Sequence, residues 1–174
     1  NDNDNDVYIG GASGYPGRIF LNNGNSEFIM KYQPSFLGDK NFEDMGVLFI
    51  DVDEDGDLDL FVASGGVECV PGSSLLLDRI YLNDGLGNFT KGHSSLMPDI
   101  RTSSSVVAAA DIDLDGTQEI FIGGRVVPGK YPLSPNSFII KKIGSNYSDA
   151  TTKLAPEIKN AGMVTSAIFS DVDI

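Results

Sequence analysis

Short apolar runs separated by turn-forming residues make up most of the chain. The runs are rich in Val, Ile, Phe and Tyr, and Gly, Asn, Asp and Pro lie between them. This is the pattern of β-strands joined by tight turns. Asn-Asn-Gly at 22–24 and Asn-Asp-Gly at 83–85 provide the left-handed conformations that hairpin turns require. No long segment has an apolar stripe of helical period, so the pattern predicts an all-β protein of small antiparallel sheets.

These segments recur at regular spacing. The acidic segment at 51–59 returns at 111–119, sixty residues later, and begins once more at 171–174. An apolar run precedes each copy, and a hairpin segment recurs in phase with the acidic segments. The apolar runs are at 47–50, 106–110 and 165–170, and the hairpin segments are at 18–24, 79–85 and, in a weaker form, 137–143. The repeats predict units at about 1–46, 47–105 and 106–164, with the start of a next unit at 165–174.

Repeats of roughly 50 residues that each form a small antiparallel sheet are typical of β-propeller blades with four strands. A propeller closes with at least about four blades, and this sequence holds fewer than three complete units. We therefore expect about three blades of a larger propeller, a fragment, with a naturally short and self-assembling chain as the alternative. Open propeller edges would favour self-association.

The charge of the chain is strongly acidic and unevenly placed. Twelve basic residues face 25 acidic ones, for a formal net charge of −13. Six of the acidic residues lie within 51–59 and four within 111–119. This balance argues against a nucleic-acid partner, because a polyanion requires a basic face. No apolar run approaches the roughly 20 residues that cross a bilayer, so we expect no membrane span in this segment.

The acidic segments have the spacing of a calcium loop, D-x-D-x-D-G-x-x-D. Calcium takes about six to eight oxygen ligands from carboxylates, backbone carbonyls and water. Acids at positions 1, 3 and 5 can converge on one side of a turn that the glycine at position 6 permits. The carbonyl at position 7 and a bidentate acid at position 9 then complete the site. The predicted metal ligands are Asp51, Asp53, Asp55, Asp57 (through its carbonyl) and Asp59 in one loop, and Asp111, Asp113, Asp115, Thr117 (through its carbonyl) and Glu119 in the other.

The acidic loops admit other interpretations. An EF-hand would need a glutamate at position 12 and flanking helices, but Val62 and Ile122 stand there in strand-like runs. Magnesium is less suitable because it prefers rigid octahedral geometry and retains its waters. The remaining alternative is a pair of solvated turns without metal, in which close carboxylates would repel each other. Partial loops at the two ends, with Asp2, Asp4, Asp6, Asp171 and Asp173, are possible metal loops that we expect to bind weakly or not at all.

The complete motif resembles a known repeat. The sequence at 51–62, followed by Arg-Ile-Tyr-Leu-Asn-Asp-Gly at 79–85, is similar to an FG-GAP or VCBS repeat, the unit of integrin-α-like seven-bladed β-propellers. The connectors at 10–18 and 123–132 resemble those of bacterial VCBS-repeat proteins of the ASPIC/UnbV-associated type. The resemblance implies Ca²⁺ in loops between strands, an extracytoplasmic location and a role in adhesion or binding. The chain departs from the pattern at Glu119, where aspartate is usual.

The sequence is compatible with two functions. The favoured one is a non-enzymatic, calcium-binding scaffold of an exported bacterial protein, with an unknown protein or glycan as ligand. The alternative is part of a propeller enzyme that acts on polysaccharide or phosphoester, with its catalytic residues outside this chain. A catalytic cluster could draw here only on His93, Arg125, Lys130 and Tyr131, which favours binding over catalysis.

Overall fold

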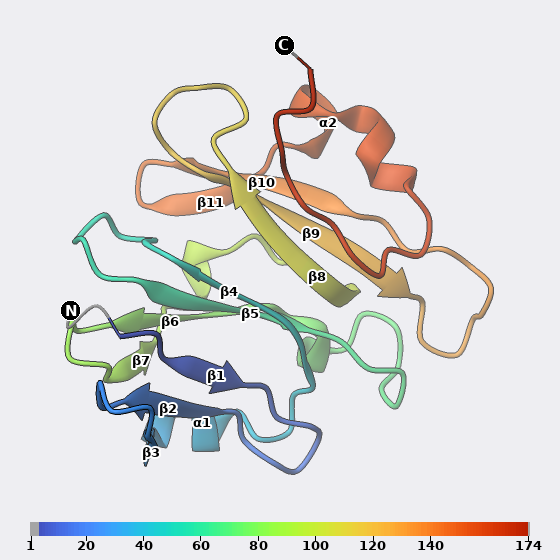
Figure 1. The fold of residues 1–174 in the computed structure, drawn as a ribbon. Helices are drawn as coiled ribbons and strands as arrows, with labels where there is room; N and C mark the ends of the chain where they lie inside the picture. Colours follow the sequence, from blue (N-terminus) through green and yellow to red (C-terminus); the bar gives the residue numbers. More distant parts are fainter. Residues whose placement is uncertain (1–3, 174) are drawn as a thin grey trace.

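Three antiparallel sheets stacked one on another form the protein (Figure 1). The computed structural model describes residues 4–173. The first sheet has the order β1-β2-β3, the second β4-β5-β6-β7 and the third β11-β10-β9-β8. The strands are β1 (Val7–Ile9), β2 (Arg18–Asn22), β3 (Phe28–Lys31), β4 (Asp44–Ile50), β5 (Asp59–Ser64), β6 (Arg79–Asn83), β7 (Phe89–Lys91), β8 (Ser103–Ala110), β9 (Glu119–Val126), β10 (Phe138–Ile143) and β11 (Asn146–Asp149). The predicted all-β class and its blade-like sheets are confirmed.

The strand register relates each repeat to the next. In the strand that follows the acidic loop, Val7 pairs with Phe20, Leu60 with Tyr81 and Ile120 with Ile140. These pairs occupy the same place in the three sheets. The acidic loop at 51–59 joins β4 to β5, and the loop at 111–119 joins β8 to β9. Both loops therefore lie at the same end of their sheets.

The core lies in two layers on either side of the second sheet. Along β5, Leu60 and Val62 pack with Tyr8 and Phe36 in the layer shared with the first sheet. The alternate residue Phe61 packs into the layer shared with the third sheet. Every residue of β5 is buried, because both faces of this strand are covered by neighbouring sheets. The first six residues of β9 are likewise buried, which explains the continuous apolar runs in the sequence.

Hydrogen bonds to a buried ion pair of the second sheet join the first sheet to the second. Asp44, at the start of β4, pairs through Oδ1 with the guanidinium of Arg79 on β6, and the two side chains are 3% and 4% exposed. Its Oδ2 accepts hydrogen bonds from the Tyr8 hydroxyl at 2.8 Å and from the Gly11 N–H at 2.7 Å. Burial raises the pKa of Tyr8, and the Asp44 carboxylate raises it further. A satisfied network of this kind fixes the orientation of the two sheets.

Two features of the secondary structure were not predicted. The connectors contain short helices that were not expected, because one or two turns are too short to show an apolar period: α1 (Pro34–Gly38), α2 (Thr151–Leu154) and 3-10 helices at Ser74–Leu76, Ser94–Leu96 and Pro156–Asn160. The apolar run at 165–170 forms no strand. In the complete units the corresponding strand pairs with the strand after the acidic loop, whereas the run at 165–170 has no such pairing within residues 4–173.

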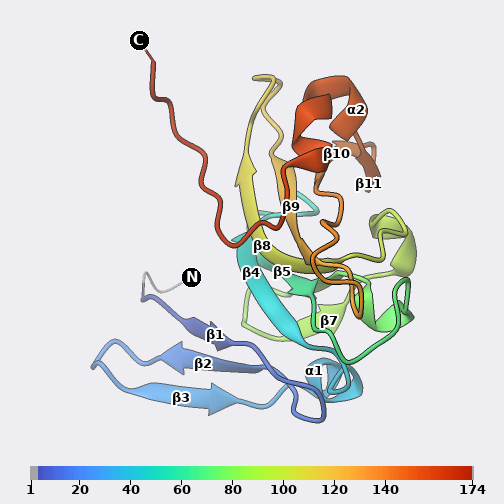
Figure 2. The ribbon, with the colours of Figure 1, turned by 90° about the vertical axis from the view of Figure 1, so that its right-hand side faces the viewer.

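The C-terminal segment instead continues past the edge of the third sheet (Figure 2). The Val164 N–H donates to Gly124 O at 2.9 Å, and Ile168 and Val172 beyond it are 88% and 90% exposed. Within residues 4–173, the helices are all too short and too polar to be transmembrane helices.

Candidate metal centre

The loop between β4 and β5 reverses the chain through two left-handed residues, Glu54 at φ 65° and Gly56 at φ 93°. The carboxylate of Asp51 holds the turn, because its Oδ1 accepts the Glu54 N–H at 2.8 Å and its Oδ2 accepts the Gly56 N–H at 3.1 Å. The sequence predicted the glycine at position 6. It gave no signal for the left-handed residue at position 4, where glutamate stands in place of the glycine or asparagine that usually adopt this conformation.

The loop between β8 and β9 has the same backbone. Leu114 at φ 59° and Gly116 at φ 92° occupy positions 4 and 6. Asp111 accepts the N–H groups of Asp115 at 3.1 Å and Gly116 at 2.9 Å. Asp115 Oδ1 accepts the N–H of Thr117 at 2.9 Å, as Asp55 Oδ1 accepts the Asp57 N–H in the other loop. The repeated motif thus folds twice into one geometry.

The acid at position 9 anchors each loop to its sheet. Asp59 is fully buried, with Oδ2 accepting the Val52 N–H at 2.9 Å and Oδ1 accepting the Asn83 N–H at 2.8 Å. Burial raises its pKa, the two N–H groups act against that shift, and the carboxylates of Asp53 and Asp55 add to it. Glu119 is also fully buried and accepts the Ile112 N–H at 2.8 Å. These acids are held by the backbone first, so a metal would have to use their remaining lone pairs.

Three carboxylates converge in each loop. Asp51, Asp53 and Asp59 place one oxygen each within 4.8 Å of one another, and Asp111, Asp113 and Asp115 do the same. Oxygen donors alone are the ligand set that Ca²⁺ prefers. In the part of the chain that the structure describes, no lysine or arginine forms an ion pair with the first three acids. The residues of the loop at 51–59 therefore fit a divalent cation.

The N-terminal partial loop keeps part of this geometry. Asp6 Oδ1 accepts the Asn22 N–H at 2.8 Å, as Asp59 accepts that of Asn83. Asp4 lies against the hairpin glycine Gly24, as Asp57 lies against Gly85. Asp2 is outside the described residues. At the other end, Asp171 and Asp173 are exposed on the C-terminal segment.

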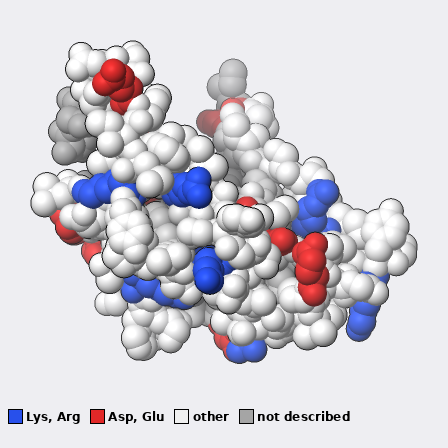
Figure 3. Space-filling model, turned by 90° about the horizontal axis from the view of Figure 1, so that it is seen from below, with Lys and Arg blue, Asp and Glu red and all other residues white. Residues whose placement is uncertain are grey.

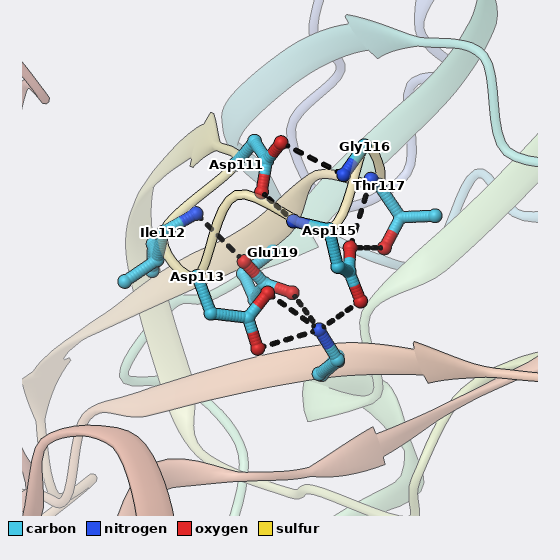
Figure 4. Close-up of polar contacts among 8 residues, drawn as sticks. Asp111, Ile112, Asp113, Asp115, Gly116, Thr117 and Glu119 are labelled. Atoms are coloured by element: carbon cyan, nitrogen blue, oxygen red, sulfur yellow. Dashed lines mark hydrogen bonds and ion pairs between the residues drawn. The ribbon is translucent and has the colours of Figure 1, made fainter.

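A lysine that the sequence analysis missed lies inside the loop at 111–119. Lys141 on β10 extends its ammonium to Asp113, Asp115 and Glu119, and the three carboxylates converge on it (Figure 4). Lys141 stands 22 residues beyond Glu119, so the loop motif carries no sign of it. The hairpin copies at 18–24, 79–85 and 137–143 align Lys141 with Asn22 and Asn83, so they gave no signal for it. The strand register instead places Lys141 at the position of Leu21 and Leu82.

The comparison with protein families supports the repeat assignment. Residues 1–62 match the model of the FG-GAP-like repeat. This range covers the first sheet and the whole loop at 51–59. Over these residues the chain is similar to an FG-GAP-like repeat, which confirms the predicted resemblance for this part of the chain. No curated protein was found to match the chain.

Proposed function

We propose that this chain is a calcium-stabilised segment of a β-propeller that serves as a binding scaffold. The observation that carries the proposal is the convergence of Asp51, Asp53 and Asp59 within 4.8 Å, next to a buried end of β5. Like charges this close disfavour one another, and a bound Ca²⁺ would remove that repulsion. The ion would also tie the loop backbone to the sheet through Asp59.

The proposed stabilisation is a binding effect. A ligand that binds the folded state and not the unfolded chain stabilises by RT ln(1 + [L]/Kd), or about 2.7 kcal/mol at 100 times the Kd. The loop oxygens are brought together only by the turn at 54–56 and by the burial of Asp59. The folded loop is therefore the form that would bind the ion.

The proposed scaffold role includes a cellular location and a binding partner. We propose that the parent protein is exported, where millimolar calcium can fill such loops, and that a protein or glycan is bound. The face seen from below carries scattered basic side chains among acidic ones and no single basic patch (Figure 3), so a polyanion is a poor partner for this face. The enzymatic alternative would need a positioned base, whereas His93 is exposed and accepts the Ser95 N–H at 3.2 Å.

Thermal unfolding with and without Ca²⁺ tests the metal site. Saturating Ca²⁺ should raise the melting temperature of the chain by roughly 5–10 °C relative to a chelator. Asp53→Ala should lose most of this response, because it removes one of the three converging carboxylates. An unchanged melting curve for the wild-type chain would exclude calcium as a stabilising ligand.

Glu54 provides the matched control. It lies one residue from Asp53 but directs its carboxylate to Lys142 at 2.7 Å, away from the predicted ligands. Glu54→Gln should keep the calcium response of the wild-type chain. If it abolished the response as Asp53→Ala does, loss of negative charge and not of a ligand would explain both results.

A further inference from the structure

We propose that the ammonium of Lys141 serves as the built-in cation of the loop at 111–119, so that this loop closes without a metal ion. The loop at 51–59 and the loop at 111–119 would then differ in kind, although they share one motif. The inference rests on the proposed function in one respect, namely that the first loop binds Ca²⁺.

The contacts of Lys141 account for most of the predicted metal donors. Its Nζ lies 2.8 Å from each carboxylate oxygen of Asp113, 2.6 Å from Asp115 Oδ2 and 2.9 Å from Glu119 Oε1. Its side chain is 18% exposed, and that of Glu119 is 0% exposed. An ammonium has three donors, and here they are directed at three separate carboxylates. The Lys141 ammonium already offsets the repulsion among these three carboxylates, so a metal ion is not needed to offset it.

The neighbouring repeats show that this lysine is a local substitution. Lys141 follows Ile140, the residue that pairs with Ile120, and the residues that follow Phe20 and Tyr81 in the equivalent pairs are Leu21 and Leu82. Leucine at this place packs its side chain against the core clusters. At this position Lys141 instead extends its ammonium to the carboxylates of the loop.

One further change accompanies the lysine. Position 9 is Asp6 and Asp59 in the other units but Glu119 here. The Oδ1 atoms of those aspartates accept the N–H groups of Asn22 and Asn83, whereas Glu119 Oε1 accepts Lys141 Nζ at 2.9 Å. The longer side chain at position 9 thus carries its carboxylate to the lysine. Lysine, glutamate and loop form one arrangement that the other units lack.

Calcium and this ammonium exclude one another. Calcium binds oxygens at about 2.3–2.6 Å, so an ion among Asp113, Asp115 and Glu119 would stand next to Lys141 Nζ and be repelled by it.

Calcium stoichiometry of the chain tests the inference. In calorimetric titration, Lys141→Leu should bind about one Ca²⁺ more than the wild-type chain, because leucine restores the residue of the other units and frees the four oxygens. Adding Asp113→Asn to Lys141→Leu should remove the extra ion. The reciprocal change, Leu82→Lys, should place an ammonium beside Asp59 and reduce the wild-type count.

Lys142→Leu is the matched control. The Lys142 ammonium pairs with Glu54 of the other loop at 2.7 Å, so its removal should leave the calcium count unchanged. Equal counts for wild type and Lys141→Leu overturn the inference. If Asp53→Ala removes no ion from the wild-type chain, the proposed function fails at 51–59, while the Lys141→Leu comparison still decides the present inference.

A second measurement tests the inference without a substitution, in case the Lys141→Leu variant does not fold. The ¹⁵N signal of the Lys141 ammonium in the wild-type chain should be protected from exchange and should stay unchanged when millimolar Ca²⁺ is added. Displacement of this signal by Ca²⁺ would overturn the inference without any substitution.

Discussion

Carboxylates in this protein differ mainly in what surrounds them. Asp59 and Glu119 are buried and held by backbone N–H groups. Asp44 is buried and neutralised by Arg79. Asp78, between β5 and β8, instead accepts the Ser64 N–H at 2.8 Å and the Ser104 hydroxyl at 3.3 Å. Burial raises the pKa of Asp78 to about 7, against the action of these hydrogen bonds and of Arg79.

Asp78 should make the stability of the protein fall between acid and neutral pH. Its folded pKa lies above the value of about 3.9 in an unfolded chain, so its contribution is full below about pH 4 and is lost as the pH rises through about 7. Asp78→Asn cannot ionise. Its free energy of unfolding relative to wild type should therefore rise between pH 4.5 and pH 8, by up to a few kcal/mol.

Urea denaturation of both chains at several pH values measures this difference. Asp99→Asn is the control, because the Arg101 guanidinium lowers the pKa of the exposed Asp99 and no such rise is expected. A difference between Asp78→Asn and wild type that stays constant with pH would contradict the prediction.

The sheets pack closely enough that backbone meets backbone. At the contact of β4 with β8, a Cβ atom on Gly46 would lie 2.8 Å from Ser105 O and 3.1 Å from Val106 Cα. Neither atom belongs to a side chain that could move aside. Glycine at this place allows the second and third sheets to approach, and the interlocking of β5 with the layer behind it depends on that approach.

Gly46→Ala should destabilise the protein by about 1–3 kcal/mol, as overpacking of a core does. The melting temperature should fall by roughly 2–4 °C for each kcal/mol. Gly38→Ala is the control, since a Cβ there meets no atom within 4 Å. Equal melting temperatures for the two variants would show that the sheets can move apart without cost.

The stack of sheets leaves one apolar sheet face open. On the first sheet Val7 pairs with Phe20, and Phe20 with Met30, which places these three side chains in one row. Val7, Ile9 and Met30 are 38%, 55% and 53% exposed. Apolar side chains gathered on an exposed sheet face are typical of a surface that another element covers.

We expect this face to drive concentration-dependent self-association of the chain. Met30→Lys should weaken the association, because a charge in the row opposes its burial. Sedimentation velocity over a range of concentrations measures the effect, with Val70→Lys, which is 72% exposed on a connector, as the control. A wild-type sedimentation coefficient that does not change with concentration would contradict the expectation.

Much of the fold could be predicted because its signals are local. Short apolar runs indicate the strands, and glycine after asparagine or aspartate indicates the hairpin turns. Alternating aspartates with a glycine at position 6 indicate the acidic loops. Each of these depends on the conformational preferences of a few consecutive residues. The sixty-residue spacing of Asp51 and Asp111 then predicts the repeat, and residues 1–62 match the FG-GAP-like repeat model.

Features that join distant residues could not be predicted in this way. Lys141 reaches Asp113 from another strand, and the Asp44–Arg79 pair joins β4 to β6, two strands of the second sheet that are 35 residues apart at this contact. The charge inside a loop depends on which strand neighbours it and on what that strand carries at one register position. Two loops with the same acidic motif therefore enclose different charged groups, because the tertiary structure, and not the motif, brings the lysine to one of them.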